Sequence, residues 1–371
     1  MTMEGNAIIQ ADALRAFVAA VFERAGLAPG PASDAADVLV WANLRGVDTH
    51  GVRNLKPLYI NLIDQGRIDA RARCTVEYET PLTARVDGGG GLGLANACWG
   101  MRLAMEKARQ SGIGLVAMRH SHHFGAAGYY PWMALQQDLI GIGLTGRFAA
   151  RGAEIGVVPT FAAVPMFSTN PISIAFPTAE EPPFLLDMAT SITPYNRVKM
   201  YQELGRILPL GWGMDDQGQP ATDPAVVRRL YPLGGSREMG GHKGYGLAMV
   251  VEVLCAGLSG EWCDGHDEDD RCFEGYAQTH DAHFFGAIRV DLFRPLEEFK
   301  RSMDAMIRAL HAAPKEPGQE RIYVAGEIEH ETEQERRRKG IPLPANVVAD
   351  LQELSRRFDV PLALGEAKAG P

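Results

Sequence analysis

Residues 113–146 read IGLVAMRHSHHFGAAGYYPWMALQQDLIGIGLTG, and their hydrophobic pattern decides the fold class. The apolar runs 113–119 and 140–146 predict strands, and the segment between them predicts a helix with Pro131 in its first turn. This order of strand, helix and strand is typical of a parallel pair within an α/β layer structure. We therefore expect an α/β protein.

The predicted first strand ends at the sequence SHHFG, residues 121–125. His123 would lie just past the carboxyl end of that strand, where open α/β sheets bind their ligands. Histidine exchanges protons near neutral pH, so His123 is a candidate general acid/base. A metal cluster of His120, His122 and His123 is not expected, because adjacent side chains diverge and no nearby carboxylate completes a shell.

Composition limits the classes of partner. The chain has 371 residues, enough for two lobes, with a net charge of −9 and 46% hydrophobic residues. Mixed charges with an acidic balance argue against nucleic acid as a partner. Neither a membrane-spanning segment nor a secretory signal is visible, so we expect a cytoplasmic protein.

The five cysteines are scattered and odd in number, which fits reduced thiols. Cys263, His266 and Cys272 lie close together, but their spacing matches no standard zinc pattern. We predict no metal site there.

Four further patterns predict elements elsewhere in the chain. Residues 13–27 predict an amphipathic helix, and Ser33 is a candidate N-cap of the next one. The apolar run from Tyr245 predicts a buried helix, and residues 283–293 predict a late strand.

The glycine run VDGGGGLG at 86–93 has two interpretations. Gly88, Gly90 and Gly93 match the dinucleotide pattern G-x-G-x-x-G between a strand and a helix. However, the next strand ends in Arg119 instead of an acid, and four consecutive glycines match many patterns by chance. We interpret the run as a turn.

Two more loops contain residues that suit anions. In DTHGVRN, residues 48–54, Arg53 could hold a carboxylate, although a solvated loop is an alternative. In GGHKGYGL, residues 240–247, Lys243 stands at a helix start, where free N–H groups favour phosphate. A tight turn that caps the helix explains that motif equally well.

Taken in order, these segments resemble the type-2 malate/L-lactate dehydrogenase family, together with STNPISIAFP, LLDMATS, HFFGAI and AGE…ERRRKGIPL. The resemblance implies a non-Rossmann mixed sheet with helices on both faces and a helical domain built from both chain ends. We place the helical domain at 1–82 and 328–371 and the α/β cofactor-binding and catalytic core at 83–327. The resemblance also implies a homodimer and NAD or NADP as cofactor.

The resemblance also assigns residues to the site. His123 matches the catalytic histidine, and His50, Arg53 and Ser121 are the expected substrate-binding residues. The expected cofactor-binding residues are Thr169, Asn170, Asp187, Met188, Ala189, Thr190, His242, Lys243, Gly326 and Glu327.

Three departures from the family pattern are visible. The family places an arginine four residues after the histidine and a tyrosine four residues later. Here Asn54 and Leu58 hold those places, and Arg53 and Tyr59 are each one residue away. The frequent Thr-Asn-Ser reads Thr-Gly-Arg at 145–147, and TPYNR at 193–197 replaces a common Gly-Lys pair.

The resemblance predicts an NAD(P)-dependent oxidoreductase that transfers hydride between nicotinamide and a small 2-hydroxy or 2-oxo acid, with His123 as general acid/base. A cyclic 2-imino acid reductase of the same family is one alternative. A non-catalytic nucleotide-binding homologue is another, and a metal hydrolase that uses the histidine run is a third.

Overall fold

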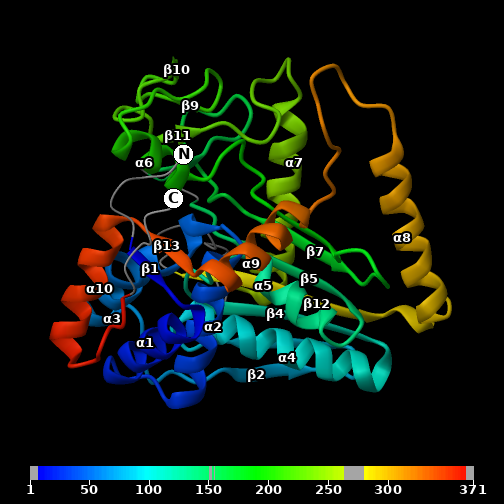
Figure 1. Cartoon of the computed structure of the whole chain (residues 1–371), viewed down its shortest axis with the longest axis horizontal. Coiled ribbons are helices and arrows are strands. Elements are labelled where there is room, and N and C mark those ends of the chain that lie inside the picture. The colour runs from blue at the N-terminus through cyan, green and yellow to red at the C-terminus, as the bar shows by residue number, and fades with distance from the viewer. Residues whose placement is uncertain (1–6, 150–152, 154, 263–279, 365–371) are drawn as a thin grey trace, which may run out of the picture.

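The computed structural model describes residues 7–149, 153, 155–262 and 280–364. Within this part of the chain the central element is a seven-stranded mixed sheet with the order β2-β3-β4-β12-β5-β7-β8 (Figure 1). β3 and β4 are parallel, and the other neighbouring strands are antiparallel. The strands are β2 (Thr75–Glu79), β3 (Thr83–Asp87), β4 (Ile113–Ser121), β5 (Leu139–Gly146), β7 (Ile172–Phe176), β8 (Phe184–Met188) and β12 (Asp281–Arg289).

The predicted pairing of the strands within 113–146 is wrong in one respect. β4 and β5 run in the same direction, but β12 lies between them and pairs antiparallel with both. The first seven residues of β12 are buried, as expected for a strand in the middle of a covered sheet. β12, which is distant in sequence, therefore separates the two strands that the pattern of residues 113–146 predicts to be neighbours.

Helices cover both faces of the sheet, which confirms the predicted fold class (Figure 1). α4 (Gly93–Ser111) and α5 (Tyr129–Leu135) pack on one face. α7 (Gly241–Glu252) and its π-helical continuation, Val253–Gly257, pack on the other face.

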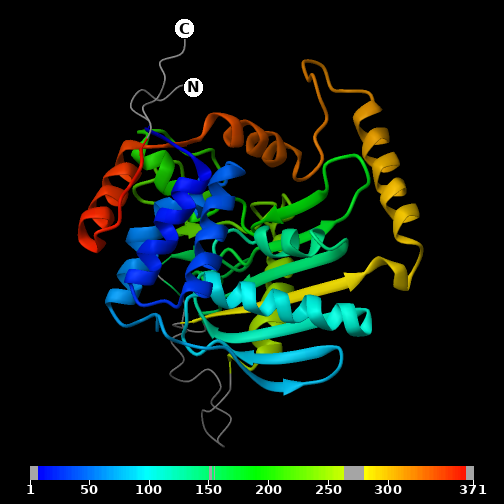
Figure 2. The same cartoon turned by 60° about the horizontal axis from the view of Figure 1, so that its bottom comes forward.

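The two chain ends form one helical part, as predicted. β1 (Ala7–Ile9) pairs antiparallel with β13 (Ile341–Leu343), and the N-terminal helices lie beside the C-terminal one (Figure 2). The exact boundary at 82/83 stays a prediction, and β2, which precedes it, belongs to the main sheet. The helices of this part are α1 (Ala11–Arg24), α2 (Pro29–Leu44), α3 (Asn61–Asp64), α9 (Glu327–Lys339) and α10 (Ala345–Phe358).

A second, four-stranded sheet with the order β10-β9-β11-β6 forms a small separate layer. Its strands have two residues each, too few to give a period-2 pattern in the sequence. The elements of this region are β6 (Gly156–Val157), α6 (Tyr195–Glu203), β9 (Gly213–Met214), β10 (Pro220–Ala221) and β11 (Arg229–Leu230). The remaining helix, α8 (Leu296–Ala312), follows β12.

Two helix predictions need correction. α2 begins at Pro29 and not after Ser33, because proline at the first helical position has its φ preset for the helix. α7 is apolar but only partly buried, since Leu247, Val250 and Met249 are exposed. No helix among the described residues has the length and apolarity required to cross a membrane.

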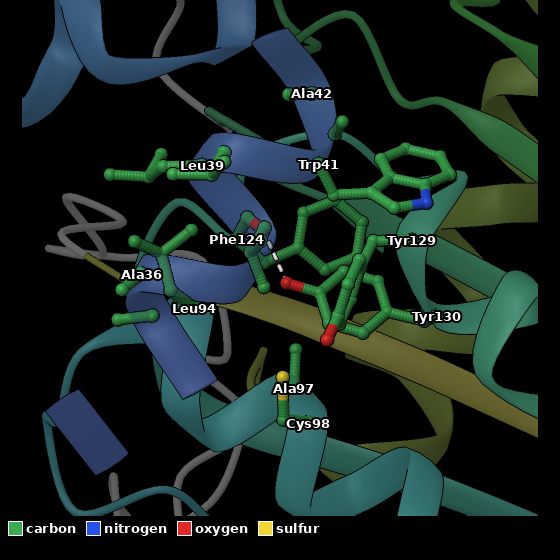
Figure 3. Packing of buried hydrophobic residues seen from close by; sticks show 14 of the residues in the cluster. Ala36, Leu39, Trp41, Ala42, Leu94, Ala97, Cys98, Phe124, Tyr129 and Tyr130 are labelled. Carbon is green, nitrogen blue, oxygen red and sulfur yellow. Dashed lines mark hydrogen bonds between the residues drawn. The ribbon is translucent and has the colours of Figure 1, made fainter. Parts of the chain in front are cut away.

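The helical part and the sheet share one hydrophobic core. Trp41 of α2 packs edge-to-face on Tyr129 of α5, with ring centroids 5.6 Å apart (Figure 3). The neighbouring Tyr130 is fully buried, and its hydroxyl donates a hydrogen bond to the carbonyl oxygen of Phe124 (Figure 3). This bond joins α5 to the loop that contains His123.

Removal of that hydroxyl should destabilise the protein. In Tyr130→Phe the buried carbonyl of Phe124 loses its partner, and we expect the free energy of unfolding to fall by about 1–3 kcal/mol. Denaturation by urea measures this change. Tyr129→Phe is the matched control, because no hydrogen bond of the Tyr129 hydroxyl occurs among the described residues. Equal midpoints for the two variants would contradict the assignment.

Candidate active site

His123 lines a cavity of about 330 Å³ at the carboxyl end of β4. The other walls come from the N-terminal segment that contains His50 and Arg67, the end of β5, residues 168–171, and Asp281 of β12. The cavity therefore lies where the helical part meets the sheet.

The glycine run holds the loop that contains His123. Gly88 N–H donates to the carbonyl of Arg119 at 2.9 Å, and Gly90 N–H donates to that of His120 at 2.8 Å. A Cβ atom on Gly93 would lie 1.8 Å from the carbonyl oxygen of His122. These glycines let the chain approach its own backbone, which confirms the predicted turn and leaves the dinucleotide interpretation without support.

The ring of His123 is fixed by contacts at Nδ1. The Tyr59 hydroxyl lies 2.7 Å from Nδ1, and the Gly125 backbone nitrogen lies 3.3 Å from the same atom. The His50 ring stacks on it with centroids 5.8 Å apart and an interplanar angle of 14°. Nε2 has no hydrogen-bond partner among the described residues, so it is the ring nitrogen that a ligand can use.

A π-helix, Leu55–Ile60, positions Tyr59. Because a π-helix closes i→i+5 bonds, it accommodates an extra residue in one turn. Tyr59 is one residue later than the family pattern, yet its hydroxyl reaches His123.

The structure does not place Arg53 among the cavity-lining residues. Its Nη2 atom lies 2.7 Å from Oε1 of Glu203, on α6. Asn54, at the family's arginine position, is buried and donates to the carbonyl of Thr49 at 2.9 Å. The arginines that do line the cavity are Arg67 and Arg147.

An ion pair forms another part of the cavity wall. Nε of Arg147 lies 2.6 Å from Oδ1 of the buried Asp281. Burial acts to raise the pKa of Asp281, but the charge of Arg147, together with its hydrogen bond, holds the pKa below its ordinary value. Asp281 is therefore ionised at neutral pH.

The two stacked histidines are neutral at pH 7. Burial lowers the pKa of His123, Asp281 partly opposes this, and Arg147 lowers it further. Burial and the neighbouring His123 lower the pKa of His50 to about 3. A neutral His123 can accept a proton, and Asp281 favours the charged form that results.

Ser121 lies behind the cavity and not on its wall. Its buried hydroxyl is 2.9 Å from Nε2 of His283, and Nδ1 of His283 is 2.8 Å from the Thr145 hydroxyl. This chain of hydrogen bonds ties the end of β4 to β12 and β5. Its contact with substrate stays a prediction.

His122 lines the cavity, and the Nδ1 atom of His120 lies 3.1 Å from Asp87. No group of three histidine, cysteine or acidic residues in the described ranges could hold a metal ion. Cys263, His266 and Cys272 lie outside the described residues.

The cofactor segments before β7 and at the end of β8 come together beside the cavity. Thr169 lines it, whereas the buried Asn170 donates from Nδ2 to Glu252 of α7 at 2.9 Å. The Thr190 hydroxyl donates to the carbonyl of Asn170 at 2.9 Å, and Asp187 accepts the N–H of Gly128 at 2.7 Å. These side chains shape the site and are already hydrogen-bonded within the protein. The second of these segments, 187–190, also includes Met188 and Ala189.

The remaining two cofactor segments lie apart from the cavity wall. His242 and Lys243 are in the first turn of α7, and Nδ1 of His242 is buried without a hydrogen-bond partner among the described residues. Gly326 is the N-cap of α9, and Glu327 is paired with His311 at 2.7 Å. Their approach to a cofactor stays a prediction.

Sequence analysis missed Asp281 and Arg67. Asp281 and His283 are separated by one residue at the start of an apolar strand, a spacing that places both on one face. That polar pair was the available signal. Arg67 lies in a polar loop after α3, and no pattern in the sequence around it indicated a site residue.

A neutral histidine at a strand end, in a small cavity with two guanidinium groups, is the arrangement expected of an enzyme for a small acid. The family model described as malate/L-lactate dehydrogenase matches residues 9–352. The chain belongs to this family of hydroxyacid dehydrogenases, as the sequence motifs predicted.

The similarity extends over nearly the whole chain. A malate dehydrogenase of Pyrococcus abyssi is 39% identical over 356 residues, 95% of each chain. The crystal structure of malate dehydrogenase from Entamoeba histolytica superposes with a TM-score of 0.87 at 37% identity, covering 96% of this chain and 99% of that one. A Δ1-pyrroline-2-carboxylate/Δ1-piperideine-2-carboxylate reductase of Pseudomonas putida is 34% identical over 247 residues, 67% of this chain and 70% of the reductase.

The low pKa of His50 predicts acid-sensitive stability. His50 takes up a proton near pH 6.5 in the unfolded chain but only near 3 in the native protein. Its contribution is therefore complete above pH 6.5 and is lost as the pH falls. Between about pH 7.5 and about pH 5.5, His50 alone should lower the free energy of unfolding by about 1 kcal/mol.

Urea denaturation at the two pH values tests this expectation. His50→Gln should remove that part of the loss, whereas His330→Gln on α9 should keep it. An undiminished loss in His50→Gln would show that the histidine is not held neutral.

Proposed function

We propose that the chain is an NAD(P)-dependent oxidoreductase that transfers hydride between nicotinamide and a small 2-hydroxy or 2-oxo acid, with His123 as general acid/base. The main support is the geometry of His123. Its Nδ1 atom is held by Tyr59 at 2.7 Å, and the ring lines a cavity of about 330 Å³. The names of the malate dehydrogenases among its relatives support the substrate class.

The residues at the start of α7 fit a nicotinamide dinucleotide. The first turn of a helix presents backbone N–H groups that favour phosphate, and Lys243 adds an exposed positive charge there. The buried Nδ1 atom of His242 has no partner among the described residues and is available to a ligand. When bound, the cofactor supplies the hydride donor or acceptor.

His123 would move the proton that accompanies hydride transfer. In oxidation, its Nε2 atom accepts the substrate hydroxyl proton, and in reduction the protonated ring returns it. For Nε2 to accept, the neutral ring has its proton on Nδ1, where the Tyr59 oxygen accepts it, and Nδ1 keeps this bond in the charged ring. Asp281 stabilises the charged ring.

Loss of His123 should remove most of the turnover. For His123→Ala we expect kcat to fall about 10²–10⁴-fold, the usual contribution of a general acid/base. The absorbance of reduced nicotinamide measures turnover with pyruvate, oxaloacetate and pyrroline-2-carboxylate. His120→Ala is the matched control, because its ring binds Asp87 and does not line the cavity. Full turnover by His123→Ala would exclude the proposed role.

The same assay separates the alternatives. Preference for pyrroline-2-carboxylate would indicate the cyclic 2-imino acid reductase, an activity in the name of the Pseudomonas putida relative. A non-catalytic homologue would bind NADH or NADPH in calorimetry without turnover of any substrate. The support for that hypothesis is the altered register at 53–59 and the Gly146-Arg147 pair, and the contact between Tyr59 and His123 weakens the first of these.

We also propose that the protein is a homodimer. The outer face of α7 and its continuation exposes Leu247, Val250, Val253 and Leu258. Next to it, Tyr78, Leu115, Leu258 and Phe284 line a groove of about 480 Å³. A contiguous apolar face of this kind is typical of an interface, and a second copy of the chain would cover it.

Val250→Asp should therefore weaken association. A charge buried at the interface is costly, so we expect a monomer mass by light scattering at concentrations where the wild type is a dimer. Leu310→Asp, an exposed leucine on α8, is the control that should remain dimeric. An unchanged dimer of Val250→Asp would move the interface elsewhere.

A further inference from the structure

The proposed substrate carries a carboxylate, which a cation near His123 would bind. In a 2-hydroxy or 2-oxo acid, the carboxylate is bonded directly to the carbon that bears the reacting oxygen. The group that binds the carboxylate must therefore lie beside His123. The resemblance assigned this task to Arg53, whose guanidinium is instead paired with Glu203.

Arg147 is better placed than Arg53. It lines the cavity, and its side chain is 37% exposed. Only Nε is used, in the 2.6 Å contact with Asp281, and the two Nη atoms have no hydrogen-bond partner among the described residues. A guanidinium held in this way presents a planar fork that matches a carboxylate.

The backbone of Arg147 is also fixed. Its N–H donates to Oδ1 of Asn170 at 3.4 Å, and its carbonyl accepts the N–H of Ser168 at 3.0 Å. Asn170 is in turn held by Glu252. The arginine is therefore preorganised from both its main chain and its Nε atom.

Arg67, the other cavity arginine, is less suitable. It lies in an exposed loop, and no ion pair fixes it among the described residues. Its charge acts on the pKa of His122, whereas the charge of Arg147 acts on the pKa of both His122 and His123. Of the two guanidinium groups, Arg147 is therefore electrostatically coupled to the proposed acid/base.

We propose that the Arg147 guanidinium binds the carboxylate of the 2-oxo or 2-hydroxy acid whose C2 oxygen faces His123, an inference that rests on the proposed function. Asp281 holds the Nε edge, and the Nη atoms receive the substrate. Arg147 replaces the serine frequent in the family pattern, so this chain supplies its clamp from the end of β5. Arg53 then has a structural contact with α6.

Steady-state kinetics with the wild type and Arg147→Gln test the clamp. We expect KM for the 2-oxo acid to rise about 10- to 100-fold, the size of a lost charge-assisted hydrogen-bond pair, with KM for the cofactor unchanged. Arg147→Lys keeps the charge without the fork and should give a smaller rise. Arg289→Gln is the matched control, because Arg289 also pairs through Nε with an aspartate, Asp291, and is remote from the cavity.

A second variant serves as the control for an effect of the substitution on folding. Arg147→Gln leaves Asp281 buried without its cation, so the double variant Arg147→Gln/Asp281→Asn removes both charges. The double variant should retain the wild-type melting temperature and still show the raised KM. Recovery of the wild-type KM in the double variant would overturn the proposal.

A binding measurement distinguishes this inference from the proposed function. Calorimetry with oxalate and oxamate, in the presence of NADH or NADPH, needs no turnover. If Arg147→Gln loses their binding about 10- to 100-fold, the clamp stands even if no substrate is turned over. The proposal would be overturned if Arg147→Gln bound oxalate and oxamate normally, or if the wild type did not bind them. A larger loss of binding in Arg53→Gln or Arg67→Gln would also overturn it, as would an effect of Arg147→Gln on the cofactor KM alone.

Discussion

Strand β12 hydrogen-bonds to β4 on one side and to β5 on the other, and this double pairing fixes where the ends of those strands meet. Asp281, its first residue, comes to lie beside Arg147 at the end of β5 and near His123 beyond β4. Behind them, His283 links Ser121 and Thr145. The shape and the charge of the cavity both follow from that arrangement of strands.

The electrostatics of the cavity are those of a low-dielectric site with few charges. Burial keeps His50 and His123 neutral, and the ionised Asp281 is compensated by Arg147. A neutral histidine beside a paired carboxylate can accept a proton at modest cost, because the carboxylate stabilises the imidazolium. Asp281 therefore acts on both proposed functional groups: it stabilises the charged form of His123 and holds the guanidinium of Arg147.

The N-terminal segment completes the site from another layer of the fold. Tyr59 reaches His123 because the turn that contains it is a π-helix, and His50 stacks on the same ring. A residue count along the sequence assumes 3.6 residues per turn, so it misplaces a tyrosine in a wider turn. Arg53, in the preceding 3-10 turn, contacts Glu203 of α6, and no local pattern specifies that contact.

The sequence by itself determined the α/β class, the glycine turn and the position of His123, because periodicity, backbone freedom and a strand end are local properties. Order and spacing of its motifs also determined the family. Tertiary structure alone decided that β12 separates β4 from β5, that Tyr59 contacts His123, and that Arg147 and Asp281 face the cavity. These features depend on pairing between segments far apart in the chain, and such pairing leaves no period within any one of them.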